Sequence, residues 1–221
     1  MKRSAVLIIL AGLLCCAAMA LVDGLWQPAY ALKSGIKVVL FLLIPLGLSL
    51  LQKDVAFREL FRFRKKGFAI ALGLGIGIYG VILGAYLLVR NWFDFSGIAK
   101  SLSQNAGVTK DNFLFVSLYI SFANSLLEEF FFRGFLFTNL KRLRSRSFAY
   151  GFSALLFSVY HVAMMIGWFS PVLFILVMVG LMAGGMIFNW LNERLDTIYC
   201  SWLTHMFANF AINTIGFMLM A

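Results

Sequence analysis

Two glutamates, two histidines and one asparagine are the residues of this chain whose types and spacing favour acid–base chemistry. Glu128 and Glu129 stand together in the otherwise apolar stretch SLLEEFFFRG, where one serine and one arginine accompany them. The only two histidines, His161 and His205, each lie inside an apolar segment, and Asn209 follows the second histidine by four residues. Ionisable groups are costly to insert in such segments, so they indicate a functional site.

The spacing of the charges in this stretch separates the two glutamates. Glu129 and Arg133 stand at i and i+4, so a helix places them on one face as an ion pair. Glu128 points about 100° away and has no intrahelical partner of this kind. A charge at the centre of a span costs about 2.5–3.5 kcal/mol on insertion scales, which makes Glu128 the candidate for chemistry. The alternative is that these charges only mark the end of the span, where long side chains reach the interface.

Helix geometry predicts that three of these residues lie at a similar depth. Glu128, His161 and His205 lie 13, 15 and 11 residues from the nearest flanking cation of a basic loop. At about 1.5 Å per residue, these separations correspond to depths of roughly 20, 22 and 16 Å. One buried site is the simplest interpretation, although either histidine alone would serve equally well as an interhelical hydrogen-bonding residue.

Two polar stripes accompany these residues. The first recurs at three- and four-residue intervals before Glu128 and consists of Ser117, Ser121, Asn124 and Ser125. The second recurs every four residues in the last apolar segment and consists of Ser201, His205, Asn209 and Asn213. A polar face on an otherwise apolar helix predicts a lined cavity.

The composition indicates the surroundings of these helices. Of the 221 residues, 62% are hydrophobic and only 13% are charged, which is far from the usage of a soluble domain. The apolar segments of roughly spanning length are 4–22, 36–51, 67–89, 112–137, 148–168, 171–190 and 198–219. We therefore predict an all-α polytopic transmembrane helical bundle of about seven to eight membrane helices. It forms a single domain over residues 1–221, with the motif-bearing core at about 112–221.

Two features of these segments bear on their packing and bounds. The segment 36–51 is short and contains Pro45, which favours a tilted or re-entrant segment or different bounds. Glycines recur at three- and four-residue spacing in two other segments, where they predict faces for close helix packing. These glycines are Gly73, Gly77, Gly80, Gly84, Gly180 and Gly184.

The distribution of lysine and arginine predicts the orientation. Of the 19 residues of these two types, thirteen lie on the side of the N-terminus and Arg133 lies within a span. The other five are assigned to the external side: Lys33, Lys37, Arg90, Lys100 and Lys110. Because short cytoplasmic loops carry the excess, we expect a multi-pass protein of the cell membrane with a cytoplasmic N-terminus. The net charge of +10 then reflects topology and attraction to membrane lipid. No soluble basic domain or motif indicates binding to nucleic acid.

The first twenty residues, MKRSAVLIILAGLLCCAAMA, have two interpretations. The basic start, the apolar core and the closing Ala-Met-Ala have the form of a cleavable secretory signal. A retained first helix is favoured, because a protein with several further spans needs no separate signal.

Three motifs occur in order on successive apolar segments. They are EEFFFR at 128–133, FSVYH at 157–161 and HMFAN at 205–209. In these motifs the chain resembles the CPBP family of intramembrane proteases, also called the Abi family. That family includes the CAAX prenyl endopeptidases and bacteriocin-processing or self-immunity enzymes. The resemblance runs from about residue 112 to the C-terminus, and it implies a fold of about eight membrane helices and endopeptidase cleavage near the cytoplasmic membrane surface.

The resemblance also implies which residues form the site. Its catalytic residues are Glu128, Glu129, His161, His205 and Asn209, and its supporting residues are Arg133 and Phe157. Peptide hydrolysis needs an activated water, donors to the developing oxyanion and a proton for the leaving amine. Glu128 and His161 are suited to hold and deprotonate the water. His205 and Asn209 are suited to donate to the oxyanion.

Metal dependence stays open at this point. Enzymes of the family are often named metalloproteases, and a zinc ion would take Glu128, His161 and His205 as ligands. If Arg133 occupies Glu129, however, these three ligands leave no separate general base. This favours catalysis without a metal or another cofactor.

The expected partner is a peptide or protein substrate, and the sequence leaves its identity open among a prenylated C-terminus, a leader peptide and another membrane protein. The alternative functions are a non-catalytic membrane regulator or immunity protein and, less favoured, a small proton-coupled transporter. A non-catalytic relative would be expected to lack a motif residue, and a transporter to show duplicated halves with broken helices. The sequence shows neither feature, so a peptidase is the favoured function.

Overall fold

The computed structural model describes residues 2–57, 60–62, 65–98 and 108–220 of the chain. These residues form helices joined by short connections, and no strand occurs in this part of the chain. Seven helical segments are long and apolar enough to cross a membrane: Arg3–Trp26, Tyr30–Leu51, Gly67–Val89, Lys110–Leu143, Arg146–Met165, Pro171–Leu195 and Ile198–Met220. The prediction of an all-α polytopic bundle is confirmed.

The second span is longer than predicted. It consists of α2 (Tyr30–Val38), the π-helix η2 (Val39–Leu43) and α3 (Ile44–Leu51), so it begins before residue 36. Two lysines and a serine in its first turns lower the local hydropathy, which hides its start in the sequence. Pro45 lies in the first turn of α3, where the π-helix before it accommodates the missing N–H.

The fourth span carries the first motif and is wound irregularly. It runs through α6 (Lys110–Tyr119), η3 (Ile120–Asn124), α7 (Ser125–Glu129), η4 (Phe130–Thr138) and α8 (Asn139–Leu143). The elements η3 and η4 are π-helical, and such winding is common at functional sites because it re-aims side chains. The side chains of Thr138 and Asn139 donate to the backbone oxygens of Arg133 and Gly134, which stabilises the second π-helix.

The other spans are more regular. They are α1 (Arg3–Leu21) with η1 (Val22–Trp26), α4 (Lys65–Val89), α9 (Arg146–Tyr160) with the short α10 (Val162–Met165), α11 (Pro171–Leu195) and α12 (Ile198–Met220). Ser145 accepts a hydrogen bond from the backbone N–H of Phe148 and so caps the start of α9. Proline at the first turn of α11 and left-handed Asp196 after its last turn set the ends of that helix.

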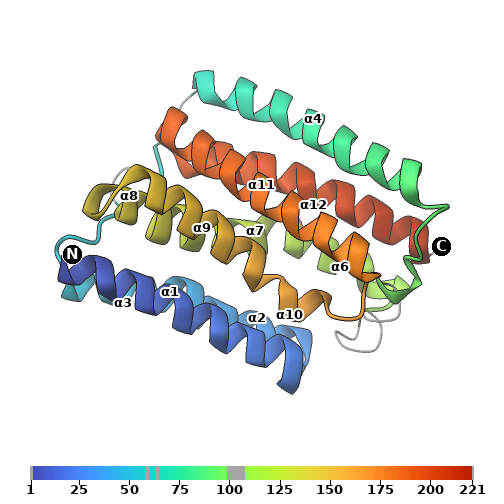
Figure 1. Cartoon of the computed structure of the whole chain (residues 1–221), viewed down its shortest axis with the longest axis horizontal. Coiled ribbons are helices and arrows are strands. Elements are labelled where there is room, and N and C mark those ends of the chain that lie inside the picture. The colour runs from blue at the N-terminus through green and yellow to red at the C-terminus, as the bar shows by residue number, and fades with distance from the viewer. Residues whose placement is uncertain (1, 58–59, 63–64, 99–107, 221) are drawn as a thin grey trace.

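The helices pack around the fourth span. Figure 1 shows α1, α2 and α3 along one edge of the bundle and α4 along the opposite edge. Helix α12 packs against α4 and against α7, while α9 packs against α11, α1 and η4. The N- and C-termini lie at opposite ends of the bundle, as seven crossings require (Figure 1). Helix α7, with its two glutamates, therefore lies inside the bundle.

An aromatic cluster joins the N-terminal hairpin to the fourth span. The ring of Phe41 stacks on Phe131 with centroids 4.1 Å apart, and it meets Phe132 and Tyr160 at 5.6 and 5.3 Å. All four rings are buried. Packing of this kind fixes the second span against η4 and the end of α9.

Close helix packing uses other glycines than those predicted. A side chain added at any of the six predicted glycines would meet no described atom within 4 Å. Close approaches occur at other glycines, among them Gly75, which lies against Phe207 of α12, and Gly185, which lies against the backbone of Ala154 in α9. The predicted packing faces were therefore wrong, because spacing alone does not show which side of a helix meets a neighbour.

Candidate active site

Glu128, Glu129 and His205 meet in one buried cluster. The Nδ1 atom of His205 lies 3.0 Å from Oε1 of Glu129, and its Nε2 atom lies 3.8 Å from Oε2 of Glu128. The side chains of these three residues are buried. Helix α7 supplies both carboxylates and α12 supplies the imidazole, so the first and third motifs come together as the sequence predicted.

Glu129 and Arg133 form the predicted ion pair. The guanidinium NH1 lies 3.2 Å from Oε1 of Glu129, and both side chains are fully buried. The guanidinium carbon lies 4.3 Å from the ring centroid of Phe157 and 4.9 Å from that of Phe188. Two aromatic faces and one carboxylate therefore replace the water around this cation. This packing places Phe157, the first residue of the second motif, beside the ion pair.

His161 is the residue at which helix α9 ends. Its Nδ1 atom lies 2.7 Å from the backbone oxygen of Phe157. A carbonyl oxygen only accepts, so Nδ1 carries the proton and Nε2 is left as an acceptor. The imidazole interacts electrostatically with both Glu128 and His205. The ring of Phe157 contacts both imidazoles, with its centroid 4.8 Å from that of His161 and 5.7 Å from that of His205, and Nε2 of His161 is suited to accept a hydrogen bond from water.

Asn209 lies one turn after His205 on α12. Its Nδ2 atom donates to the backbone oxygen of Ile120, 3.2 Å away in η3. An amide nitrogen has two N–H groups, so the second remains for another acceptor. The site therefore retains one amide donor near the histidine.

The two polar stripes mainly join helices to one another. Asn213 donates to Ser117 O and to Ser121 Oγ, at 3.1 and 3.0 Å. The indole N–H of Trp202 donates to Ser125 Oγ at 3.0 Å. These contacts fix α12 against α6, η3 and α7, so most of the stripe serves packing where the sequence predicted the lining of a cavity.

Lys37 is a site residue that the sequence analysis missed. Its Nζ atom lies 2.6 Å from Oε1 of Glu128 and 2.5 Å from Oδ1 of Asn124. The lysine lies in α2 and is buried, although its place near the start of a span led to its assignment to the external side. Glu128 therefore has an ionic partner, from a different helix. The available signal was a lysine that follows Lys33 by one helical turn at the edge of an apolar segment.

The charges of the cluster balance. Two cations, Lys37 and Arg133, are paired with two carboxylates, Glu128 and Glu129. Buried charges are tolerated when they are paired in this way, whereas removal of one partner leaves an uncompensated charge. Each glutamate thus has its own cation, and the histidine of α12 contacts both glutamates.

The zinc ligand set considered from the sequence does not fit this arrangement. Among the residues that the structure describes, no three His, Cys, Asp or Glu side chains are grouped so that they hold one metal ion. The ammonium group of Lys37 lies at one oxygen of Glu128, where it would repel a second cation bound to the same carboxylate. We therefore derive no catalytic step through a metal.

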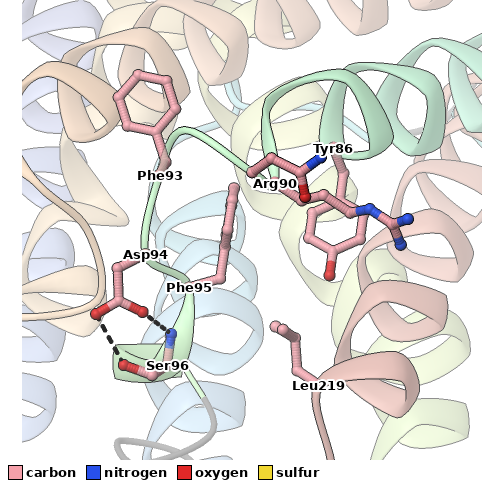
Figure 2. A pocket seen from close by; sticks show the side chains of 8 residues that line it. Tyr86, Arg90, Phe93, Asp94, Phe95, Ser96 and Leu219 are labelled. Atoms are coloured by element: carbon pink, nitrogen blue, oxygen red, sulfur yellow. Dashed lines mark hydrogen bonds between the residues drawn. The ribbon is translucent and has the colours of Figure 1, made fainter.

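A surface hollow lies apart from this cluster. Figure 2 shows it between the ends of α4 and α12, where Tyr86, Arg90, Phe95 and Leu219 line it. The carboxylate of Asp94 accepts from the backbone N–H and the hydroxyl of Ser96 and so stabilises the turn at its rim (Figure 2). No motif residue lines this hollow, so it is not assigned to the candidate site.

Comparison with known families bears on the part of the chain that contains the cluster. No curated protein and no solved structure matches the chain. A family model does match, and it spans residues 110–211, from the start of α6 to within α12. All three motifs lie within this range. This match agrees with the resemblance drawn from the motifs: residues 110–211 are similar to the family described as type II CAAX prenyl endopeptidase Rce1-like.

Proposed function

We propose that the chain is an intramembrane endopeptidase that hydrolyses a peptide bond near the cytoplasmic membrane surface. Residues 110–211 match a CAAX endopeptidase family model, and one structural observation supports the proposal. The buried carboxylate of Glu128 has one oxygen bound to a lysine and the other directed toward His205. A carboxylate placed in this way is suited to act as a general base on water.

The proposed reaction begins with a water between Oε2 of Glu128 and Nε2 of His161. Glu128 takes a proton from the water while the water oxygen attacks the carbonyl carbon of the peptide. The tetrahedral intermediate then expels the amine, which receives the proton from Glu128. His161 accepts a hydrogen bond from the water and orients it, which the tautomer fixed by Phe157 O supports.

The oxyanion of the intermediate is assigned to His205 and Asn209. Because Nδ1 of His205 contacts the Glu129 carboxylate, its other nitrogen, Nε2, faces the reacting atoms. In the proposed reaction, His205 donates from this nitrogen when the nitrogen carries a proton, and Asn209 donates from its second N–H. Donors fixed before the reaction stabilise the developing charge without reorganisation.

The proposed substrate is a peptide with a prenylated C-terminus. The family description supports this class, and a prenyl group in the bilayer would bring the scissile bond to a membrane-embedded site. A leader peptide or a segment of another membrane protein is the competing class.

The test uses the purified chain in proteoliposomes. The probe is a farnesylated peptide that ends in Cys-aliphatic-aliphatic-X, and mass spectrometry detects the released tripeptide. We expect release by the intact chain, none by Glu128→Gln, and much less from the same peptide without farnesyl. Equal cleavage of both peptides would overturn the substrate class.

A second arm addresses the activity itself. The proteomes of cells that carry the intact chain or Glu128→Ala are compared for membrane peptides that accumulate uncleaved in the variant. If the farnesylated peptide is not cleaved and no such peptide accumulates, the chain is not a peptidase and the non-catalytic alternative takes its place.

A further inference from the structure

In the hydrogen bonds of the described residues, the carboxylate of Glu128 is held through one of its two oxygens. The Oε1 atom accepts from Nζ of Lys37 at 2.6 Å and from Nδ2 of Asn124 at 3.1 Å. The Oε2 atom has neither of these contacts and lies 3.8 Å from Nε2 of His205. A carboxylate that is anchored at one oxygen has its other oxygen fixed in direction.

Lys37 is itself held firmly. Besides Glu128 it contacts Oδ1 of Asn124 at 2.5 Å, and its ammonium lies 5.0 Å from the ring centroid of Tyr160 and 5.6 Å from that of Phe41. The side chain is buried and has few rotamers open to it among these partners. The ammonium is therefore a fixed donor, in contrast to a mobile surface lysine.

This lysine comes from outside the segment that matches the family. It lies in the second span, whereas the family match begins at residue 110. The stacked rings of Phe41 and Phe131 join that span to η4, directly after the two glutamates. The N-terminal hairpin thus reaches the candidate site and contributes a charge to it.

We propose that Lys37 is a positioning residue for the peptidase reaction. This inference rests on the proposed function. Lys37 and Asn124 bind Oε1 of Glu128, so that Oε2 points toward the histidines and the water between them. Without Lys37 the carboxylate rotates away from the attacking geometry, and a displacement of about 1 Å at a catalytic group can reduce the rate about 100-fold.

A merely structural role predicts a different result. If Lys37 only neutralises a buried charge, its loss lowers stability, and the remaining folded protein works normally. If Lys37 positions Glu128, its loss lowers kcat of the folded protein and leaves KM nearly unchanged, because substrate binding does not use this lysine. The split between kcat and KM therefore separates the two roles.

The chain offers a matched control in Lys33. It lies one turn before Lys37 on the same helix and forms an ion pair with Asp23, which is also buried. No motif residue contacts Lys33 in the described ion pairs or hydrogen bonds, where its partners are Asp23 and the backbone oxygen of Ala29. Lys33→Met thus removes a comparable charge pair from the same hairpin at a distance from the catalytic groups.

The experiment measures kcat, KM and thermal stability on the farnesylated peptide in proteoliposomes. We expect Lys37→Met to lower kcat of the folded protein by about 100-fold with KM changed less than threefold. Lys33→Met should keep kcat within about twofold. Lys37→Arg keeps a cationic donor and should recover at least tenfold over Lys37→Met. Wild-type kcat in folded Lys37→Met would overturn the proposal.

Two further arms keep the test decisive. If Lys37→Met does not fold, Lys37→Ala removes the donor with a smaller side chain, and unchanged kcat in that variant also overturns the proposal. If the intact chain does not cleave the peptide, the proposed function fails on this substrate. A double-mutant cycle on stability with Lys37→Met and Glu128→Gln then decides the anchoring: non-additive effects support it, and additive effects refute it.

Discussion

Glu129 binds His205 through the same oxygen that binds its cation: Oε1 lies 3.0 Å from Nδ1 of the imidazole and 3.2 Å from NH1 of Arg133. One glutamate thus neutralises a buried guanidinium and contacts His205, the proposed oxyanion donor. The neighbouring glutamate has a different cation and a free oxygen. The two carboxylates therefore have different roles, which substitutions separate.

Glu128→Gln is expected to abolish cleavage, because an amide cannot take the proton from water. A general base contributes about 10²- to 10⁴-fold, so the rate should fall by at least about 100-fold. The same change leaves Lys37 without its counter-charge and should lower the melting temperature. Adding Lys37→Met should restore stability but not activity. Cleavage at the wild-type rate by Glu128→Gln would show that Glu128 is not the general base.

Glu129→Gln is expected to act on stability first. It leaves Arg133 as an uncompensated buried cation, which costs about 3–5 kcal/mol, while the amide oxygen can still accept from His205. Activity should fall with the folded fraction, and the double variant Glu129→Gln/Arg133→Gln should regain part of both. Thermal unfolding in detergent, measured beside turnover, checks this. A well-folded but inactive Glu129→Gln protein would show that the roles of the two glutamates are reversed.

Asn209→Ala tests the oxyanion donor. Loss of one such donor typically costs about 10²- to 10³-fold in turnover, and we expect a fall of this size with little change in protein level. Asn213→Ala is the matched control, since this asparagine lies one turn further on α12 and donates only to Ser117 and Ser121 in the described contacts. It should lower the melting temperature and leave turnover per folded molecule unchanged. Normal turnover in Asn209→Ala would refute the donor role.

Chelation tests the metal-free mechanism. Because Lys37 lies at the carboxylate that zinc would need, a strong chelator is expected to leave the turnover of the purified chain unchanged. The measurement compares initial rates before and after prolonged treatment, followed by added zinc. Reversible loss of activity would establish a metal enzyme and would require Lys37 to leave Glu128.

The predicted orientation is tested with cysteines at positions 144 and 193, next to the basic ends of α8 and α11. On a background without the three native cysteines, both should react with a membrane-impermeant maleimide only in inside-out vesicles. Reaction in intact cells would show that the topology is the reverse of the predicted one and that the site lies near the other surface.

The parts of the fold that could be predicted are those set by short-range spacing. Apolar stretches of spanning length predicted all seven spans, and the i, i+4 relation predicted the ion pair between Glu129 and Arg133. Similar depth on three helices predicted that Glu128 and His205 meet. These inferences depend only on helix geometry and on the cost of charge in a bilayer.

Other features depend on contacts that no local pattern shows. Lys37 and Glu128 are 91 residues apart, and nothing in the sequence shows that the second span packs on the fourth. The π-helical winding around α7 likewise follows no local spacing that would distinguish it from an α-helix in the sequence. The glycine faces failed for the same reason: several spans carry glycines, but tertiary contacts decide which ones meet a neighbour.

The distance in sequence between Lys37 and Glu128 also has a consequence for how the protein is made. A ribosome that adds about 5–20 residues per second needs roughly 5 to 18 seconds to pass from one residue to the other. During that time the second span enters the bilayer with an ammonium group that lacks its final partner. The Asp23–Lys33 pair lies within one hairpin and can form at once. The N-terminal hairpin is therefore assembled before the site, and only the arrival of the fourth span neutralises Lys37.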